Sequence, residues 1–351
     1  MNQPNRLPTG GQIDRETLVD FVFNGRSYTG HPGDTVASAL LANGVRVVGR
    51  SFKYHRPRGI FGLGAEEPNA LLQLETGART LPNHQATRVE LYHGLRANSV
   101  NCWPNPDYDL MSIIGLFHRL TPAGFYYKTF MWPPSFWRYY EYFIRRAAGL
   151  GKAPTEPDPD QYDRMNAYAD VVIVGAGPAG LAAAHSAALS GARVIIADDQ
   201  VEPGGGLLNE RYEIDDKPAK EWVDKVIKEL TEIEEVTVLK RTTAFGLYDH
   251  NFLGMIEQRG PKLSDGEGKT RQRIWRVRAQ QVILATGAIE RPMIFSNNDR
   301  PGVMLASAVR AYVNRYGVAA GQRVAIFTNN DDAYRTAIDL ADVGVEVVSI
   351  I

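Results

Sequence analysis

A run of glycines in the middle of the chain has the spacing of a phosphate-binding turn. Residues 170–174 form an apolar stretch typical of a buried strand, and residues 175–180 follow it with the sequence GAGPAG. In such a turn Gly175 allows the sharp bend, Gly177 lets the backbone approach a pyrophosphate, and Gly180 lets the next helix pack close to the strand. The helix N-terminus then offers N–H groups to the phosphates. The sequence therefore predicts a dinucleotide site at residues 175–180.

An acidic pair lies where the ribose of a dinucleotide is usually bound. A second apolar stretch, residues 193–197, ends in Asp198, about 20 residues after the glycine turn. A carboxylate at this place accepts hydrogen bonds from a ribose 2′-hydroxyl and repels a 2′-phosphate. We expect Asp198 to hold the ribose, with Asp199 as the alternative one residue later.

Two short loops are expected to complete this site. Residues 202–207 form a glycine-rich loop suited to lie against a cofactor, and residues 281–284 form a strand that ends in small residues. Ligands bind at the carboxyl ends of strands in open α/β sheets. The expected cofactor-binding residues are Gly175, Ala176, Gly177, Pro178, Ala179, Gly180, Asp198, Asp199, Gly205, Gly206, Leu207, Thr286 and Gly287.

The sequence contains no recognisable nucleophile or metal-binding motif. It has no GxSxG turn and no HExxH helix, and its seven histidines are scattered. His185 falls on the first helix of the nucleotide fold, where we expect a packing or surface role. The single cysteine, Cys102, excludes a disulfide within the chain and a multi-cysteine metal site. We therefore assign no catalytic residue and expect no metal.

Length and charge restrict the class of protein. The 351 residues suggest two or three domains, and the net charge of −1 gives no electrostatic case for nucleic acid or an acidic membrane. Residues 1–11 are polar and lack the apolar core of a signal peptide, and no run of eighteen uncharged apolar residues exists. We expect a cytoplasmic protein that binds neither nucleic acid nor membrane.

The N-terminal part is predicted to begin with a hairpin. Residues 18–29 have strand composition around Asn24-Gly25, a strong two-residue turn signal. Asp34 is placed to cap a helix over residues 35–43. Strand, turn, strand and helix in this order are typical of a β-grasp, ferredoxin-like domain. Further strands are expected at residues 71–75 and 89–92.

Two segments of unusual composition follow. Eleven of the nineteen residues 125–143 are aromatic, which is more than a small domain can bury. We favour packing against another domain or subunit, with a local core or a membrane-surface segment as alternatives. Residues 50–58 are rich in arginine, and contact with a flavin phosphate or an acidic partner is as well supported as a solvated loop.

These features divide the chain into five predicted segments. The last residues form a second strand–helix–strand module, with strands at 323–327 and 345–351. Its turn has no glycine and carries two acids, which suits a pyrophosphate poorly. Because such a module would leave a strand at an exposed sheet edge, we expect the sequence to be part of a longer polypeptide. The segments are residues 1–100 (β-grasp ferredoxin-like domain), 101–150 (aromatic-rich interface segment), 151–168 (proline- and acid-rich linker), 169–320 (first dinucleotide-binding domain) and 321–351 (start of a second, degenerate module).

The order of these motifs resembles that of the two-dinucleotide-binding-domain flavoproteins. Residues 50–59, 124–133, 287–292 and 327–331 resemble, more closely, the alpha subunits of heterotetrameric sarcosine oxidases. The likeness covers nearly the whole chain. The expected fold class is α/β with an α+β N-terminal domain: a two-dinucleotide-binding-domain flavoprotein-like Rossmann fold preceded by a cluster-less β-grasp ferredoxin-like domain.

This resemblance implies a set of cofactors and partners. NAD⁺ would occupy the glycine turn, FAD a flavin-bearing beta subunit, and FMN a subunit interface, with smaller subunits completing a hetero-oligomer. Sarcosine would be oxidatively demethylated, the one-carbon unit would pass to tetrahydrofolate through a C-terminal region, and electrons would pass to oxygen. Related N-terminal domains hold [2Fe–2S] clusters with four thiolates. Because residues 59–68 contain no cysteine, we expect no iron–sulfur cluster.

Two alternatives remain open at this point. The chain could be a self-contained FAD-dependent amine or opine dehydrogenase with FAD at the glycine turn. It could also be a non-catalytic scaffold subunit in which the bound nucleotide never turns over. The identity of the released nucleotide separates the first alternative from the NAD⁺-binding subunit.

Overall fold

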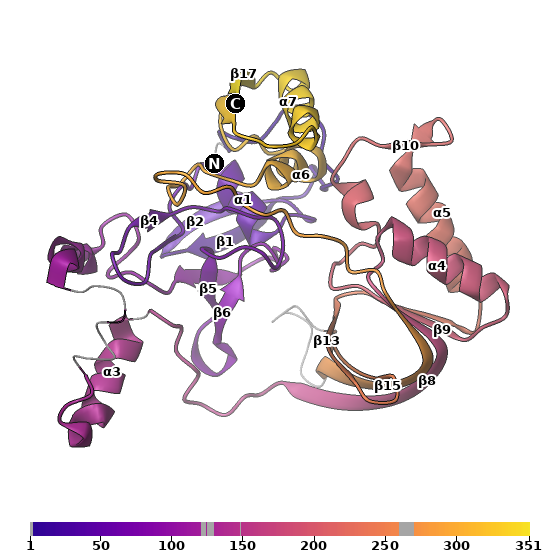
Figure 1. Cartoon of the computed structure of the whole chain (residues 1–351), viewed down its shortest axis with the longest axis horizontal. Helices are drawn as coiled ribbons and strands as arrows, with labels where there is room; N and C mark the ends of the chain where they lie inside the picture. The colour runs from indigo at the N-terminus through magenta and orange to yellow at the C-terminus, as the bar shows by residue number, and fades with distance from the viewer. Residues whose placement is uncertain (1–2, 121–123, 125–129, 148, 260–269) are drawn as a thin grey trace. The chain divides into compact units, whose positions relative to one another are not determined.

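The chain forms two compact units (Figure 1). The computed structural model describes residues 3–120, 124, 130–147, 149–259 and 270–351. Unit 1 consists of Met1–Asp158 together with Glu290–Ile351, and unit 2 consists of Pro159–Ile289. Among the described residues, no helix is long and apolar enough to cross a membrane.

A five-stranded sheet forms the base of unit 1. Asn24 and Gly25 join its first two strands with φ values of 49° and 76°, which is the conformation of a type I′ turn. The predicted hairpin is therefore confirmed. In spatial order the strands are β2 (Arg26–Gly30), β1 (Val19–Phe23), β7 (Arg96–Ser99), β5 (Leu71–Leu74) and β6 (Leu81–Gln85). Only β1 and β7 pair in parallel.

The strand predicted at residues 89–92 is wrong. The Leu91 N–H donates to the Asp34 carbonyl (2.9 Å), so this backbone holds the loop that precedes the first helix instead of joining the sheet. The Leu91 side chain packs into the core of unit 1.

Helix α1 (Val36–Ala42) is buried along its whole length against the sheet. Thr35 caps it, in a capping box with Ser38, so the expected cap at Asp34 is wrong by one residue. The Asp34 carboxylate instead accepts hydrogen bonds from the Ser38 hydroxyl (2.6 Å) and from the Arg6 guanidinium (2.6 Å). This buried ion pair between Arg6 and Asp34 ties the N-terminal arm to the domain.

Residues from the C-terminal part of the chain complete the core of unit 1. Helix α6 (Ala306–Tyr316) contributes Tyr312, whose buried hydroxyl donates to the Gly62 carbonyl (3.0 Å). Burial holds the pKa of Tyr312 well above its usual value. The predicted second module is present, with strands β16 (Arg323–Ile326) and β17 (Glu346–Ile350) in parallel and helix α7 (Asp332–Asp342) between them.

This packing joins α6 to the N-terminal sheet within unit 1. The segment 169–320 spans both units, because α6 shares its apolar core with the N-terminal sheet. Such contacts join residues far apart in the sequence, which local patterns do not report. The five predicted segments remain a prediction of the domain organisation.

Of the predicted aromatic segment, residues 125–129 lie outside the described residues. The remaining helices and strands of the N-terminal part of unit 1 lie outside its main sheet. These elements are β3 (Gly49–Arg50), β4 (Pro57–Arg58), α3 (Trp137–Ala147) and the 3-10 helices Gly77–Arg79, Leu110–Leu120 and Pro134–Phe136.

Unit 2 is built on a six-stranded sheet. Its order is β12 (Val236–Leu239), β9 (Val194–Ala197), β8 (Gln161–Val174), β15 (Thr270–Leu284), β14 (Phe252–Gln258) and β13 (Thr242–Tyr248). The first four strands pair in parallel and the last three form an antiparallel meander. Helices α4 (Pro178–Leu189) and α5 (Ala219–Glu232) pack together against the parallel strands (Figure 1). The sequence also predicts a helix around Lys220–Ile233 and strands near Val236–Leu239 and Thr242–Tyr248, and all three are confirmed.

Strand β8 begins earlier than expected. Residues 161–168, which we assigned to the linker, pair in register with β15. An ion pair between the Asp163 carboxylate and the Arg273 guanidinium (2.8 Å) holds the two strands together there, and its hydrogen bonds lower the pKa of Asp163. The polar stretch is therefore strand despite its composition. The sequence also predicts a hairpin over residues 251–275 with a charged tip at 264–270. The hairpin is present as β14 and β15, and its tip falls mostly outside the described residues.

Candidate functional site

The glycine turn lies at the carboxyl end of β8, where two of its glycines are required by backbone packing. Gly175 has a φ of +103°, and a Cβ atom there would lie 2.2 Å from the Ala285 carbonyl oxygen. A Cβ atom on Gly180 would lie 1.8 Å from the Gly175 carbonyl oxygen. These positions admit glycine alone, because β8, β15 and α4 converge on them.

Gly177 faces the opposite situation. It is the N-cap of α4, with a φ of −73°, and among the described residues no atom lies within 4 Å of its Cβ position. Pro178 occupies the first helical position, and both Pro178 and Ala179 are exposed. Glycine supplies no capping side chain, so the first-turn N–H groups of α4 face this open space. That arrangement suits an anion at the helix N-terminus.

The loop after β9 lies directly against the glycine turn. The Gly204 N–H donates to the Ala176 carbonyl (2.7 Å), and a Cβ atom on Gly205 would lie 2.9 Å from Gly177 Cα. Gly206 is exposed, whereas the Leu207 side chain packs against the core beneath α4. Gly204 was absent from the residues we expected, and the GGG run that contains it is the signal that could have found it.

The two acids after β9 have different surroundings. The Ala176 N–H donates to Asp198 Oδ2 (2.6 Å) and the Gln200 N–H donates to Asp198 Oδ1 (2.8 Å). Both oxygens of this half-buried carboxylate therefore hold the glycine turn and its own loop. Asp199 is exposed, and its Oδ1 accepts a hydrogen bond from the Gln200 side chain (3.0 Å). Sequence spacing could not distinguish the two, because the bond to Ala176 depends on how β8 and β9 are paired.

Strand β15 brings the last predicted residues to the same edge of the sheet. The Ala285 N–H donates to the Val174 carbonyl (2.8 Å), which places the end of β15 beside the start of the turn. Thr286 and Gly287 follow and are exposed. The ends of β8, β9 and β15 thus gather all the predicted site segments of unit 2 at one edge.

In the turn of the second module, polar side chains bond to the turn backbone and to Arg310 of α6. The Asp332 N–H donates to Asn330 Oδ1 (3.0 Å), and the Asp332 carboxylate lies 3.2 Å from the guanidinium of Arg310, which is buried. The turn therefore has no glycine, and the Asn330 and Asp332 side chains already pair with the N–H group and the cation that could attract a pyrophosphate.

The arginine-rich segment is engaged within unit 1. Arg50 donates to the Pro106 carbonyl (2.7 Å), Arg56 donates to Asp299 (2.7 Å), and Arg58 also pairs with Asp299. These side chains hold loops together, so both of our readings of the segment, as a cofactor or partner contact and as a solvated loop, omitted this structural role.

The lone cysteine lies in unit 1. Burial, with the nearby charge of Asp109, raises the pKa of Cys102 to about 11, so its thiol is neutral near pH 7. Within the described residues, no group of three or more histidine, cysteine or acidic side chains could hold a metal ion.

Comparison with known proteins gives two matches to protein families. Residues 16–102 match a 2Fe-2S iron-sulfur cluster binding domain, and residues 169–347 match the pyridine nucleotide-disulphide oxidoreductases. The second match covers half of the chain.

Curated sarcosine oxidase alpha subunits are similar along nearly the whole of this chain. Sarcosine oxidase subunit alpha of Rhizobium meliloti (strain 1021) is 51% identical over 99% of this chain and 35% of its own length. The subunit alpha from Corynebacterium sp. (strain U-96) is 41% identical over 98% of this chain and 32% of its own length. The chain thus spans about a third of the length of these relatives. The expected resemblance to sarcosine oxidase alpha subunits is confirmed.

A solved structure shares the fold. L-proline dehydrogenase from P. horikoshii aligns with a TM-score of 0.65 at 21% identity, covering 99% of this chain and 55% of that chain. Together with the family match, it supports a Rossmann-like α/β fold with an N-terminal domain.

The match of residues 16–102 corrects one prediction. We expected no iron–sulfur cluster, and similarity to a cluster-binding domain contradicts that expectation. That expectation rested on the absence of cysteine from residues 59–68 and on the family resemblance, whereas the match covers residues 16–102. A [2Fe–2S] cluster is held by four thiolate or mixed thiolate and histidine ligands. The side chains described here do not supply such a set, so no redox step is assigned to a cluster.

Proposed function

Because the chain belongs to the pyridine nucleotide-disulphide oxidoreductase family, we propose that it is the dinucleotide-binding part of the alpha subunit of a flavin-dependent sarcosine oxidase. One observation carries the dinucleotide site: the open space at Gly177, which lies at the N-terminus of α4 and against Gly205. The sarcosine oxidase activity is supported by the 51% identity to a sarcosine oxidase alpha subunit.

Each segment of the site has a part in binding. The first-turn N–H groups of α4 hold the pyrophosphate, and Gly177 and Gly205 leave room for it. Asp199 holds the ribose, since it is exposed beside the turn, while Asp198 positions the turn through the Ala176 N–H. Thr286 and Gly287 border the same space.

NAD⁺ is our proposed occupant, since a carboxylate at the ribose disfavours a 2′-phosphate. When bound, NAD⁺ can accept a hydride. Following the resemblance, FAD resides in a beta subunit and FMN at a subunit interface, the one-carbon unit passes to tetrahydrofolate, and oxygen accepts the electrons.

The N-terminal part of unit 1 is proposed to be a β-grasp, ferredoxin-like domain. The sheet order β2-β1-β7-β5-β6 with α1 buried against it supports this assignment. The parallel pairing of β1 with β7, after the strand–turn–strand–helix start of the chain, is in keeping with that fold.

An exposed aromatic surface is our proposed contact with the flavin-bearing beta subunit. Trp132 is 80% exposed, Leu116 77% and Tyr108 72%. Apolar side chains of this size gathered in one segment are typical of interfaces between proteins. Further exposed members are Trp103, Leu110, Ile113, Phe117, Met131, Phe136, Trp137, Tyr139 and Tyr142.

Gly177→Ala is expected to separate dinucleotide binding from folding. The methyl group meets no described atom within 4 Å, so it causes no clash and the protein should keep its fold, but it occupies the space that a pyrophosphate needs. We expect NAD⁺ affinity, measured by isothermal titration calorimetry, to fall at least about tenfold. Unchanged affinity for NAD⁺ and for FAD would contradict the site. Release of FAD in place of NAD⁺ from denatured wild-type protein would favour the self-contained dehydrogenase.

The two acids give a second, paired prediction. Asp199→Asn should lower NAD⁺ affinity about tenfold and leave stability unchanged, because a charge-assisted bond to the ribose is lost. Asp198→Ala should lower the free energy of unfolding of unit 2 by about 2 kcal/mol, because two N–H groups lose their acceptor. Hydrogen exchange of peptides covering residues 170–200, together with calorimetry, measures both effects. A reversed pattern would assign the ribose to Asp198.

A further inference from the structure

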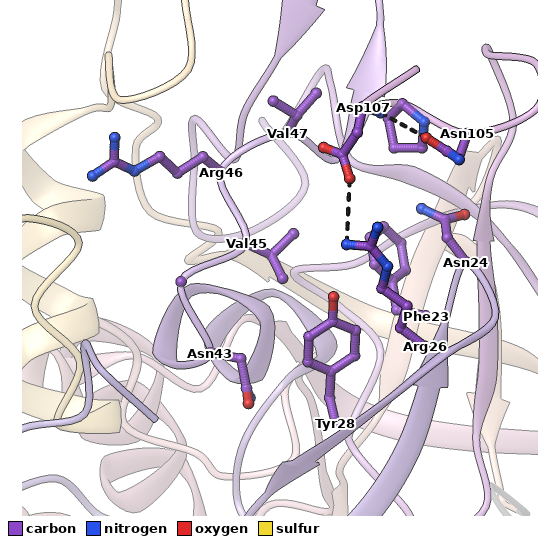
Figure 2. A pocket seen from close by; sticks show the side chains of 12 residues that line it. Phe23, Asn24, Arg26, Tyr28, Asn43, Val45, Arg46, Val47, Asn105 and Asp107 are labelled. Atoms are coloured by element: carbon purple, nitrogen blue, oxygen red, sulfur yellow. Dashed lines mark hydrogen bonds and ion pairs between the residues drawn. The ribbon is translucent and has the colours of Figure 1, made fainter. Parts of the chain in front are cut away.

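A cavity of about 370 Å³ opens in unit 1, and none of the residues of the proposed dinucleotide site lines it. It lies between the β1–β2 hairpin, the loop after α1 and residues 105–107 (Figure 2). No part of the proposed function uses it.

The walls of this cavity are held in place by hydrogen bonds. The Asn24 side chain donates to the Ser99 hydroxyl (3.0 Å), and the Asn43 amide donates to the Thr29 carbonyl (2.7 Å). Arg50 holds the third wall from outside through the Pro106 carbonyl (2.7 Å). A cavity with fixed walls can bind a small ligand at low conformational cost.

Two opposite charges face each other in the cavity. The Arg26 guanidinium and the Asp107 carboxylate are 3.6 Å apart, too long for a hydrogen bond, and their side chains are 63% and 49% exposed. Such exposed pairs contribute little stability. Figure 2 shows the Tyr28 hydroxyl pointing toward this pair, with the Val45 side chain nearby. The charges are therefore available to a ligand that offers each a better partner.

We propose that this cavity binds a small zwitterion of the α-amino acid class. The ligand carboxylate lies on Arg26, where a guanidinium can donate two parallel hydrogen bonds, and the ligand ammonium lies on Asp107. The Tyr28 hydroxyl donates to the carboxylate, and Val45 and Val47 border a small apolar side chain. A simple anion would compete with Asp107 for Arg26, and a simple cation would compete with Arg26 for Asp107, whereas a zwitterion satisfies both.

Binding of glycine to the full chain tests this proposal, by saturation-transfer difference NMR with acetate and methylamine as single-charge probes. We expect saturable binding of glycine with a millimolar Kd, and at least about tenfold weaker binding of acetate and methylamine. Arg26→Gln and Asp107→Asn should each weaken glycine binding about tenfold or more, because each removes a charge-assisted contact.

Arg46→Gln is the matched control. Arg46 lines the same cavity, but Figure 2 shows its guanidinium extending away from the Arg26–Asp107 pair, so glycine binding should not change. Three results would overturn the proposal: no saturation up to about 100 mM glycine, acetate binding as tightly as glycine, or equal effects of the three substitutions. Because the Gly177 and Asp199 variants lie in unit 2, failure here leaves the dinucleotide site untouched, and the reverse also holds.

Discussion

Gly180→Ala is expected to disrupt unit 2 at its centre. The added methyl group would lie 1.8 Å from the Gly175 carbonyl oxygen and 3.3 Å from the Ala285 side chain, and both neighbours belong to the sheet edge that carries the site. Neither can move without separating β8 from α4, so the free energy of unfolding should fall by about 3 kcal/mol or more. NAD⁺ binding should be lost with it.

Hydrogen exchange followed by mass spectrometry measures this prediction locally. Peptides covering residues 170–190 should exchange at least about 100-fold faster in Gly180→Ala than in the wild type. Gly177→Ala is the matched control. The same methyl group, added three residues earlier in the turn, meets open space and should leave exchange unchanged. Wild-type exchange rates in Gly180→Ala would show that the turn accommodates the methyl group without loss of stability, contrary to the packing described above.

The parts of the fold that sequence predicted well are those fixed by neighbouring residues. The hairpin at Asn24 and the helix over Ala219–Glu232 follow from local turn chemistry and apolar periodicity. The glycine turn was found for the same reason, since its bend, its helix start and its strand are contiguous.

What sequence missed depends on contacts between distant segments. The bond from the Ala176 N–H to the Asp198 carboxylate joins the glycine turn to the end of β9, and the spacing of the two acids does not report it. Residues 161–168 have the composition of a linker, yet they pair with β15, where Arg273 lies opposite Asp163 and forms an ion pair with it. Helix α6 completes the N-terminal core across nearly the whole length of the chain. No local pattern reports such partners.

Glu67 offers the second large effect, because it organises a loop of unit 1 from the inside. The residue is 1% exposed. Its Oε2 accepts the N–H groups of Phe61 and Gly62 (both 2.7 Å), and its Oε1 accepts those of Asn69 (2.7 Å) and Ala70 (3.0 Å). One carboxylate thus satisfies four backbone donors, and the loop closes around it.

Glu67→Gln should weaken this loop strongly although the side chain keeps its size. The amide NH₂ would point at two backbone N–H groups that now have no acceptor, at a cost of about 1–3 kcal/mol for each. We expect peptides covering residues 59–72 to exchange about 100-fold faster, which corresponds to about 3 kcal/mol of local stability.

Glu66→Gln is the control that isolates the cause. Glu66 holds the same loop, but both of its bonds, from the Leu63 and Gly64 N–H groups, reach the single oxygen Oε1. A glutamine can keep that oxygen in place, so exchange should change little. Equal acceleration in the two variants would mean that negative charge in the loop, and not the number of acceptor oxygens, holds it closed. Faster exchange in Glu67→Gln alone would show that the loop is held by backbone N–H groups bonded to both carboxylate oxygens of Glu67. Tyr312, which donates to the Gly62 carbonyl, would then anchor α6 to a loop whose shape Glu67 determines.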